Sequence, residues 1–394
     1  MWNRRDLLRT SLATLALRPW ASAMANPGRD PRLVVLILRG GMDGLGAVPA
    51  HGDPHYPRAR GAVAQARPGQ EEGALDLDGT FGLHPALQPI LPLWEAGQLA
   101  VVHAVSSPYR ARSHFDAQDV LENGTATPFG SDSGWLNRAL LDRNTSEAPA
   151  LAVGRNLPKL LRGPAPTTST DPTRKRREDQ DFLSRLSDLY ARDPELDAAL
   201  EAGVSSNAML AQRMTDANLG GQGRRGGDPA QVAQSVGGLL SQPDGPRVAV
   251  LEMSGWDTHA NQVGTLRRQL GLLGASIAAF ESALGGAWRD TILVTVTEFG
   301  RTVHANGTGG TDHGTGGACL LAGGAVQGGR VYGDWPGLAE RDLLEGRDLN
   351  PTTDLRSVLK GVLSDHMQVS SAHLEDRVFP DSASATPMKG LVAG

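Results

Sequence analysis

The feature that most constrains the fold is a set of short apolar runs in which hydrophobic and polar residues do not alternate. Five such runs are present: LVVLIL at Leu33–Leu38, LAVVHAV at Leu99–Val105, RVAVLEM at Arg247–Met253, TILVTVT at Thr291–Thr297 and ACLLA at Ala318–Ala322. Helical patterns lie between them. Strands that are apolar on both faces are typical of a parallel sheet covered by helices. We therefore predict an α/β fold with a mostly parallel sheet and helices on both faces.

Polar residues are concentrated directly after four of these runs. The clusters are RGGMDG with Asp43; SSPYRARSHFDAQD with Ser113, His114, Asp116 and Asp119; SGWDTHANQ with Asp257 and His259; and Glu298 followed by Asp312 and His313. In open parallel sheets, ligands bind beyond the carboxyl ends of the strands, which lie at one edge. We therefore expect these side chains to converge on one pocket.

The residue types in this pocket indicate a metal site. Carboxylates and imidazoles, in a chain with one cysteine, suit a divalent ion such as Mn, Zn, Mg, Ca or Fe rather than a thiolate metal. Such a cation offsets the repulsion between several gathered acids. The predicted ligands are Asp43, Asp257, His259, Glu298, Asp312 and His313. The single cysteine, Cys319, lies inside an apolar run and is predicted to be a packed strand residue.

Some of these residues have structural alternatives. Asp43, in Gly-Gly-Met-Asp-Gly, is also typical of a tight turn. His259 is also placed to cap a helix that begins near Asn261. The pair Asp312-His313 lies between glycines, where packing gives little reason for it, and it fits a metal ligand with its orienting acid.

Ser113 directly precedes the helical segment HFDAQDVLEN and is therefore predicted to be an N-cap. The same position suits a nucleophile, because the N-terminus of a helix binds phosphate or sulfate. Arg110 and Arg112 are placed to clamp such an anion. The predicted catalytic residues are Ser113, His114, Arg112 and Arg301.

The region between the second and third apolar runs differs from the rest. It contains the linker-like stretch PTTSTDPTRKRRED, a helical pattern over residues 180–212 and the flexible stretch NLGGQGRRGGDP. We predict a helical subdomain inserted at residues 164–241 that shapes access to the pocket. The length of 394 residues allows one or two domains, and we expect a single α/β domain over residues 26–394.

The first residues predict export. Paired arginines in NRRDLLR precede an apolar segment that ends in ASAMA, as in a twin-arginine signal peptide covering residues 1–25. A basic amphipathic helix or an uncleaved anchor is the alternative, but Arg18 and Pro19 interrupt a run already too short to span a bilayer. We expect the twin-arginine export machinery to deliver the protein to the periplasm or the outside, without a stable membrane anchor.

The net charge argues against nucleic-acid binding. It is −5 for the whole chain and becomes −8 once residues 1–25, with four arginines and one aspartate, are removed. Nucleic acids and anionic membranes require clustered Lys and Arg. The one basic cluster, RKRRED at residues 174–179, is balanced by adjacent acids and fits a solvated loop or helix start.

Four motifs together resemble one exported family, named domain of unknown function 1501. They are LRGGMDGLGAVPAHGDPHY, SPYRARSHFDAQD, SGWDTHANQ and TEFGRTVHANGTGGTDHG. The resemblance covers nearly the whole mature chain and implies a fold similar to the alkaline phosphatase and sulfatase superfamily. In that superfamily a metal-binding Asp follows the first strand and a nucleophile starts a helix after the second. An Asp with a His, an Asp-His-Gly and a final His come later, an order that Asp43, Ser113, Asp257 with His259, Glu298 and His313 follow.

The chain departs from that pattern at two points. The Asp-His-Gly position reads Glu298-Phe299-Gly300, which removes one ligand, and Asp257 is only two residues from His259. The resemblance thus implies an incomplete two-metal site in which Asp312 or His114 fills the vacancy. The stretch SSPYR also matches part of the sulfatase pattern, which makes Ser106 an alternative nucleophile, but the rest of that signature is missing.

Three function classes follow. The first is a metal-dependent hydrolase of phosphate or sulfate esters, acting on a small-molecule or polymeric anionic substrate through a metal-activated Ser113. The second is an exported metal-dependent binding or assembly protein with a degenerate hydrolase site. A carbohydrate-active or transfer enzyme is a third, because paired carboxylates also serve glycoside chemistry.

Overall fold

A mixed sheet forms the centre of the computed structural model, which describes residues 29–142, 150–154, 156–170, 180–193, 196–197, 200–201, 204 and 228–394. The expected signal peptide at residues 1–25 and the basic cluster at 174–179 lie outside these residues. Along the sheet the strand order is β10 (Arg330–Tyr332), β4 (Leu99–Ser106), β9 (Gly317–Ala322), β8 (Thr291–Val296), β1 (Arg32–Arg39), β7 (Val248–Ser254), β5 (Ala150–Val153) and β6 (Thr167–Thr170), and β11 (Thr353–Asp354) pairs with β4.

The central strand β1 pairs in parallel with β7 on one side and with β8 on the other. Its side chains alternate between the two faces. Leu36 and Leu38 enter one hydrophobic core, whereas Val35 and Ile37 enter the second. A strand buried on both faces has no reason to alternate polar and apolar residues, which is why its sequence is an uninterrupted apolar run.

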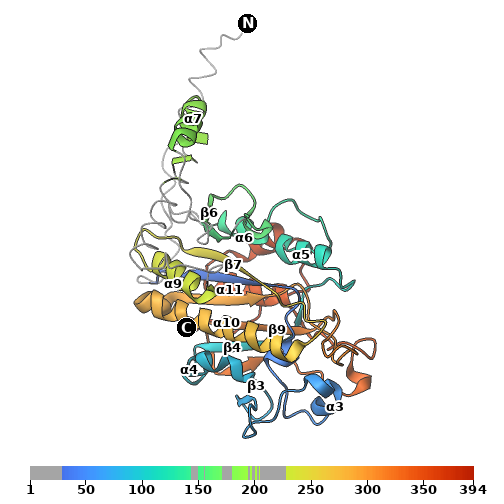
Figure 1. Cartoon of the computed structure of the whole chain (residues 1–394). Helices are drawn as coiled ribbons and strands as arrows, with labels where there is room; N and C mark the ends of the chain where they lie inside the picture. Colours follow the sequence, from blue (N-terminus) through green and yellow to red (C-terminus); the bar gives the residue numbers. More distant parts are fainter. Residues whose placement is uncertain are drawn as a thin grey trace. The chain divides into compact units, whose positions relative to one another are not determined.

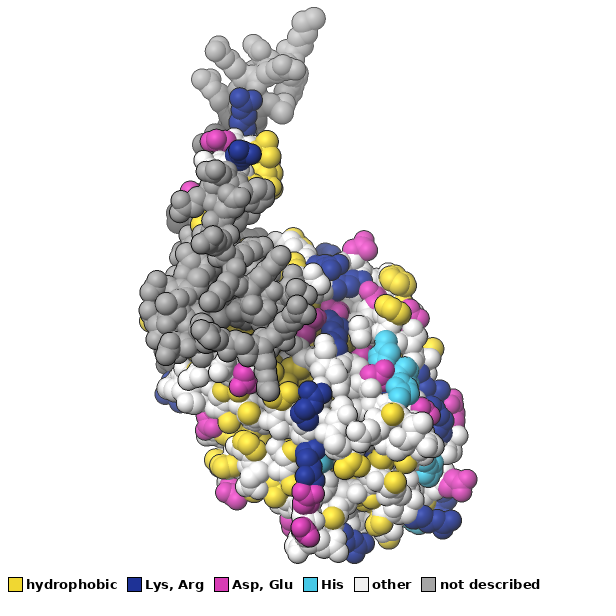
Figure 2. Space-filling view, in the orientation of Figure 1, with side chains coloured by type: hydrophobic (Ala, Val, Ile, Leu, Met, Phe, Trp, Pro, Cys, Tyr) yellow, Lys and Arg dark blue, Asp and Glu magenta, His cyan; other side chains and the backbone are white. Residues whose placement is uncertain are grey.

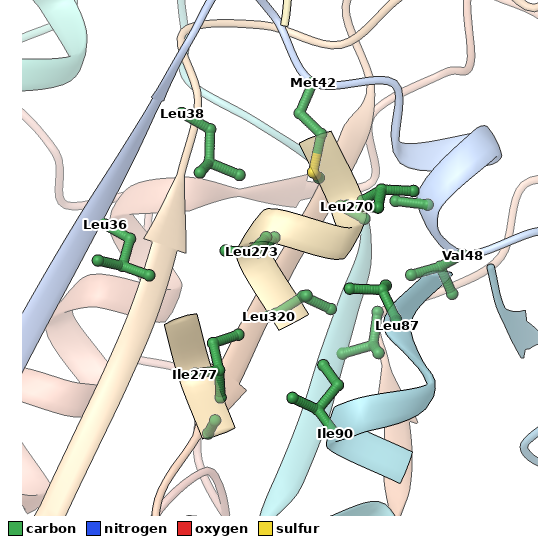
Figure 3. Packing of buried hydrophobic residues seen from close by; sticks show 14 of the residues in the cluster. Leu36, Leu38, Met42, Val48, Leu87, Ile90, Leu270, Leu273, Ile277 and Leu320 are labelled. Carbon is green, nitrogen blue, oxygen red and sulfur yellow. The ribbon is translucent and has the colours of Figure 1, made fainter. Parts of the chain in front are cut away.

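Helices cover both faces of the sheet (Figure 1). On the first face lie α9 (Pro229–Leu240), α10 (Gln262–Leu284), α4 (Leu91–Glu95) and the 3₁₀ helix η2 (Pro85–Ile90). Figure 3 shows the packing there, where Leu270, Leu273 and Ile277 of α10 meet Leu36 and Leu320 of the sheet. The second face is covered by α5 (His114–Asn123), α6 (Trp135–Leu140) and α11 (Leu355–Asp365). The predicted α/β class, with a mostly parallel sheet and helices on both faces, is confirmed.

The five predicted apolar runs all form strands, but β9 runs antiparallel to both β4 and β8. The segment between β8 and β9, residues 297–316, contains no helix. A parallel return requires a crossover connection, usually a helix, whereas a loop brings the chain back antiparallel. The short strands β5, β6, β10 and β11 were not predicted from the sequence.

The smaller elements are the helices α2 (Gly44–Ala47), α3 (Tyr56–Arg60), α7 (Gln180–Tyr190) and α12 (Ser371–His373) and the strand pair β2 (Leu75–Asp76) and β3 (Gly82–Leu83). At the two ends of the predicted insertion, β6 pairs with β5, and α9 contributes Val236 and Leu239 to the first core. Most residues between α7 and α9 lie outside the described part, so the subdomain at 164–241 stays a prediction.

One described helical stretch, Gln262–Asp290, has the length and composition of a membrane span, with a hydropathy of 1.4. It comprises α10 and a short 3₁₀ helix, and its inner side chains belong to the first core. A core helix satisfies the same criterion, and the packing of Leu270 and Ile277 accounts for its apolar character.

Candidate metal centre

Three residues from distant parts of the chain meet beyond the carboxyl ends of the strands. His114 begins α5, Asp257 follows β7 and His313 lies in the loop after β8. One ligand atom from each lies within 4.8 Å of the other two. The Nε2 atoms of His114 and His313 are 3.5 Å and 3.4 Å from the two carboxylate oxygens of Asp257. Figure 2 shows histidine side chains grouped beside acidic ones on the displayed face. We call His114, Asp257 and His313 the metal triad.

Hydrogen bonds fix the orientation of both imidazoles. Nδ1 of His114 is 2.8 Å from Oε1 of Glu298, and Nδ1 of His313 is 2.9 Å from the carbonyl oxygen of Arg112. Carboxylates and carbonyls only accept hydrogen bonds, so each Nδ1 carries a proton, and a ring without a second proton presents a lone pair at Nε2. Both Nε2 atoms are buried and have no hydrogen-bond partner. Two unpartnered Nε2 atoms beside a carboxylate are an arrangement that can hold a metal ion.

Glu298 holds His114 from behind. Its side chain is fully buried, and Oε1 also accepts hydrogen bonds from Nε2 of Gln118 at 2.9 Å and from the backbone N–H of Gly40 at 2.8 Å. Burial raises the pKa of Glu298, but the hydrogen bonds from His114 and Gln118 outweigh it and lower the pKa overall. The hydrogen bond to Glu298 in turn raises the pKa of His114. A carboxylate behind a histidine is the usual orienting partner of a metal ligand.

The backbone approaches the site closely at Gly40, between β1 and Asp43. A Cβ at this position would lie 2.4 Å from the backbone nitrogen of Asp257, and its φ of +123° is one that side-chain-bearing residues rarely adopt. The glycine-rich turn after β1 therefore serves to bring the backbone N–H to Glu298 and to let the strands β1 and β7 end side by side.

Asp257 is shared between several partners. Its Oδ1 accepts a hydrogen bond from Nη1 of the buried Arg301 at 2.5 Å and lies 2.8 Å from Nδ1 of His259. Partial burial raises the pKa of Asp257, but the hydrogen bond and positive charge of Arg301 outweigh it and lower the pKa overall. Asp257 is thus held as a carboxylate, the form that binds metal.

Phe299 forms an apolar wall behind the two imidazoles. Its ring centroid is 4.8 Å from that of His114 and 4.9 Å from that of His313, and the side chain is 3% exposed. Burial lowers the pKa of His313, which keeps this ring neutral and able to coordinate. Phe299, at which the chain departs from the pattern that its motifs resemble, thus packs against both imidazoles.

Arg112 contributes its backbone carbonyl to His313, not a free guanidinium. Its φ of +61° is uncommon for a residue with a side chain, and such strain is concentrated at functional sites. The guanidinium makes ion pairs with Asp348 at 2.8 Å and Glu345 at 2.7 Å. In the predicted anion clamp of Arg110 and Arg112, the charge of Arg112 is therefore neutralised by two carboxylates.

The other two predicted arginines are also engaged. The guanidinium of Arg301 bonds the hydroxyl and carbonyl of Thr311 in addition to Asp257. Nη1 of Arg110 donates to Oγ of Ser106 at 3.2 Å and to carbonyl oxygens of its own loop. Arg301 therefore supports Asp257, while Arg110 stabilises the loop after β4.

His259 and Asp312 lie at the exposed rim of the triad. The two rings of His259 and His313 are 4.8 Å apart, and Nε2 of His259 is 4.0 Å from Oδ1 of Asp312. About half of each side chain of this rim pair is exposed, at 45% and 52%. Both predicted ligands are therefore near the triad, and their role in binding stays a prediction.

Asp43 is not brought into the cluster. Its side chain is 1% exposed and forms an ion pair with the fully buried Arg60, while Oδ1 accepts from Gly46 N at 3.1 Å and Oδ2 from Gln262. It caps α2, which corresponds to the turn interpretation of the sequence. Because both oxygens are used by protein donors, Asp43 belongs to a separate buried ion pair and not to the predicted set of ligands around the cation.

Ser113 is the N-cap residue of α5, as predicted, but its side chain makes no capping hydrogen bond. It contacts Tyr109, whose hydroxyl donates to Asp116 at 3.0 Å. The Ser113 hydroxyl is thus not committed to the helix. Ser106, the alternative nucleophile, is 5% exposed and lines a cavity of about 10 Å³ with Phe299 and Cys319, room for no more than about one water.

Gln118 and two backbone groups complete the site, and none of them was predicted from the sequence. Gln118 lies four residues after His114 on α5, a spacing that places both on one face of the helix. That spacing was a usable signal. The carbonyl of Arg112 and the N–H of Gly40 carry no such signal, because every residue has them.

The donor set fits a metal. Two imidazole nitrogens and one carboxylate suit Zn, Fe or Mn better than Ca or Mg, which prefer oxygen ligands. The unpartnered Nε2 atoms of His114 and His313 are the observation that supports this fit. The predicted divalent metal is therefore matched by a three-residue site.

Comparison with known proteins gives one family match. A family model described as "Protein of unknown function (DUF1501)" matches residues 98–379. A search of curated proteins found no significant match to this sequence.

Several solved structures have limited similarity to the chain. The C-terminal periplasmic domain of EcEptC from Escherichia coli, in complex with Zn, is 10% identical, with a TM-score of 0.34 and coverage of 75% of this chain and 74% of that one. Ps i-CgsB in complex with k-i-k-neocarrahexaose is 9% identical, with a TM-score of 0.43 and coverages of 90% and 74%. A putative sulfatase from Bacteroides thetaiotaomicron VPI-5482 is 11% identical, with a TM-score of 0.33 and coverages of 75% and 65%. Scores below 0.5 carry no inference about the reaction, which must come from the residues of this chain.

Proposed function

Because this chain belongs to the DUF1501 family, whose description assigns no activity, we propose its function from the site: a metal-dependent hydrolase of phosphate or sulfate esters. The observation that carries the proposal is the pair of buried, unpartnered Nε2 atoms of His114 and His313 beside Asp257. Three protein ligands are the number found in catalytic zinc sites, which keep a further position for water or substrate.

His114, Asp257 and His313 would hold the ion. A bound divalent metal supplies Lewis-acid polarisation of an ester oxygen and stabilises a neighbouring alkoxide. The remaining groups act through the protein. Glu298 and the Arg112 carbonyl keep both rings in the tautomer that binds, and Arg301 keeps Asp257 ionised.

Ser113 is our candidate nucleophile, since its hydroxyl lies directly before His114 and is free of a capping bond. Its oxygen would form a bond to phosphorus or sulfur as the ester oxygen leaves, and the hydroxyl proton would pass to the solvent. His259, exposed at the rim, would supply the proton that turns the leaving oxygen into an alcohol. Water would then release phosphate or sulfate and restore the serine.

The test joins metal binding with turnover. The purified protein is analysed for metal, titrated with Zn²⁺ and Mn²⁺, and assayed on aryl phosphates, phosphodiesters and sulfates. Ser113→Ala should bind metal normally and lose at least about a hundredfold in kcat. Ser370→Ala, at the N-cap of α12, is the matched control and should keep both properties. Loss of activity in Ser370→Ala, or full activity in Ser113→Ala, would contradict the assignment.

The second candidate is a metal-dependent binding or assembly protein without turnover. The exclusion of Asp43 from the cluster favours it, because the superfamily that the motifs resemble uses an aspartate after the first strand as a ligand. Tight metal binding together with inactivity on every ester would support this candidate and reject the hydrolase.

We also propose that the protein acts in the periplasm or outside the cell after twin-arginine export. The paired arginines Arg4 and Arg5 and the small residues before Ala25 support this. Cell fractionation of the double variant Arg4→Lys, Arg5→Lys tests it. Retention of the uncleaved variant in the cytoplasm is expected, and unchanged export would reject the route.

A further inference from the structure

We propose that the natural substrate is an ester whose reacting group carries a single negative charge, such as a sulfate monoester or a phosphodiester, rather than a doubly charged phosphate monoester. This inference rests on the proposed hydrolase function. It follows from the charges that surround the metal triad, because those charges decide how much negative charge the reacting group can bring.

Two arginines at the site, Arg301 and Arg112, already serve carboxylates. Arg301 is fully buried and its guanidinium is used by Asp257 and Thr311. Arg112 is neutralised by Asp348 and Glu345. A guanidinium that already serves carboxylates offers little further attraction to a substrate anion.

Arg347, a third arginine, is paired with a carboxylate in the same way. Its Nη2 donates to the carbonyl oxygen of His313 at 2.8 Å, and its Nη1 lies 3.1 Å from Oδ1 of Asp348. Asp348 is fully buried and thus holds two arginines, Arg112 and Arg347, away from the role of anion clamp.

The exposed rim of the site is negative instead. Asp312 is 52% exposed, 4.0 Å from Nε2 of His259 and without an arginine or lysine partner within salt-bridge distance among the described residues. Asp257 and Glu298 add two carboxylates beneath it. A divalent cation in the triad would offset this negative charge. Little net positive charge would then remain to attract a second negative charge on the substrate.

Sulfate monoesters and phosphodiesters carry one negative charge at neutral pH, whereas phosphate monoesters carry nearly two, since their second pKa is about 6. A dianion would meet Asp312, and its second charge would not be matched by Arg301, Arg112 or Arg347, which already serve carboxylates. The charge balance of the site therefore selects the singly charged class.

The experiment compares esters that share one leaving group. The Zn²⁺-loaded full-length protein is assayed at pH 8 and low ionic strength with 4-nitrophenyl sulfate, methyl 4-nitrophenyl phosphate and 4-nitrophenyl phosphate. We expect kcat/KM for at least one singly charged ester to exceed that for the dianion at least tenfold. An equal or higher kcat/KM for the dianion overturns the inference and leaves the hydrolase function standing. Absence of turnover on all three rejects the hydrolase and the inference with it.

A charge-neutralising variant tests the cause. In Asp312→Asn we expect the ratio of kcat/KM for the dianion to kcat/KM for the singly charged esters to rise by about threefold. The rise should be smaller in high salt. Asp244→Asn is the matched control, because Asp244 is exposed and precedes β7, at the opposite end of the sheet from the site. A ratio of activities that Asp312→Asn leaves unchanged, or that Asp244→Asn shifts equally, overturns the electrostatic explanation.

Discussion

Exchanging Glu298 for glutamine isolates the electrostatic part of the metal site. The side chain is fully buried, and Oε1 accepts from His114, Gln118 and Gly40 at 2.8–2.9 Å. A glutamine carbonyl accepts the same three donors. The glutamine NH₂ group would replace Oε2, which lies 3.2 Å from Oγ1 of Thr297. The Thr297 hydroxyl already donates to the carbonyl oxygen of Leu38, so it has a lone pair with which to accept a hydrogen bond from this NH₂ group. The shape is conserved and only the charge is lost.

The expected loss is in metal affinity. Removing an orienting partner of a metal ligand typically costs 10–100-fold, or about 1.4–2.7 kcal/mol. Glu298 is fully shielded from solvent, so little screening weakens its effect on His114, and we expect the upper half of that range, about 30–100-fold. Chelator competition with Zn²⁺ measures the affinity, and circular dichroism confirms that the variant is folded.

The matched control is Glu122→Gln. Glu122 is another buried carboxylate on α5, but it pairs with Arg39 and accepts from the N–H of Leu160, away from the triad. Its exchange should lower stability and leave Zn²⁺ affinity within about twofold of the parent. A folded Glu298→Gln protein with parental affinity, or an equal loss in the Glu122 variant, would refute the assignment of Glu298 as the orienting group.

His313→Gln removes one unpartnered Nε2. Because a ligand is lost, Zn²⁺ binding in the same assay should weaken by more than the factor of about 100 that is typical for loss of an orienting partner. His55→Gln is the control, and an equal loss of affinity in both variants would reject the triad. Asp43→Asn leaves the buried Arg60 unpaired and should cost about 3–5 kcal/mol in urea unfolding; a cost below about 1 kcal/mol would show that the pair is not structural. Burial lowers the pKa of His103 from 6.5 to about 4, and its Nδ1 accepts from the N–H of Ala104 at 2.9 Å. Between pH 6.5 and pH 4 the unfolded chain therefore binds a proton at His103 that the folded chain does not bind. The contribution of neutral His103 to the free energy of unfolding is complete above pH 6.5 and falls by about 3 kcal/mol towards pH 4. His103→Gln should flatten the acid side of the stability profile, and an unchanged slope would contradict this origin.

The fold class was predictable because the strands β1, β4, β7, β8 and β9 are buried on both faces, and burial of that kind forces continuous apolar runs. The direction of β9 was not. It depends on the loop over residues 297–316, whose composition does not reveal whether it crosses the sheet. The strands β5 and β10 are short and lie towards the two edges of the sheet. In so few residues the spacing of apolar side chains shows no recognisable periodicity.

Asp43 and Asp257 show where sequence reasoning about the site must stop. Both follow a strand at the same edge of the sheet, so topology assigns them the same role. What separates them is the partner of each carboxylate: Arg60 from α3 and Gln262 from α10 meet Asp43, whereas Asp257 keeps Oδ2 open towards His114. A carboxylate whose oxygens are all satisfied by protein donors gains nothing from a cation, because metal binding would have to break those bonds. The predicted cluster was therefore right about which edge of the sheet gathers the polar groups, and only the contacts around each carboxylate distinguish a ligand from a structural ion pair.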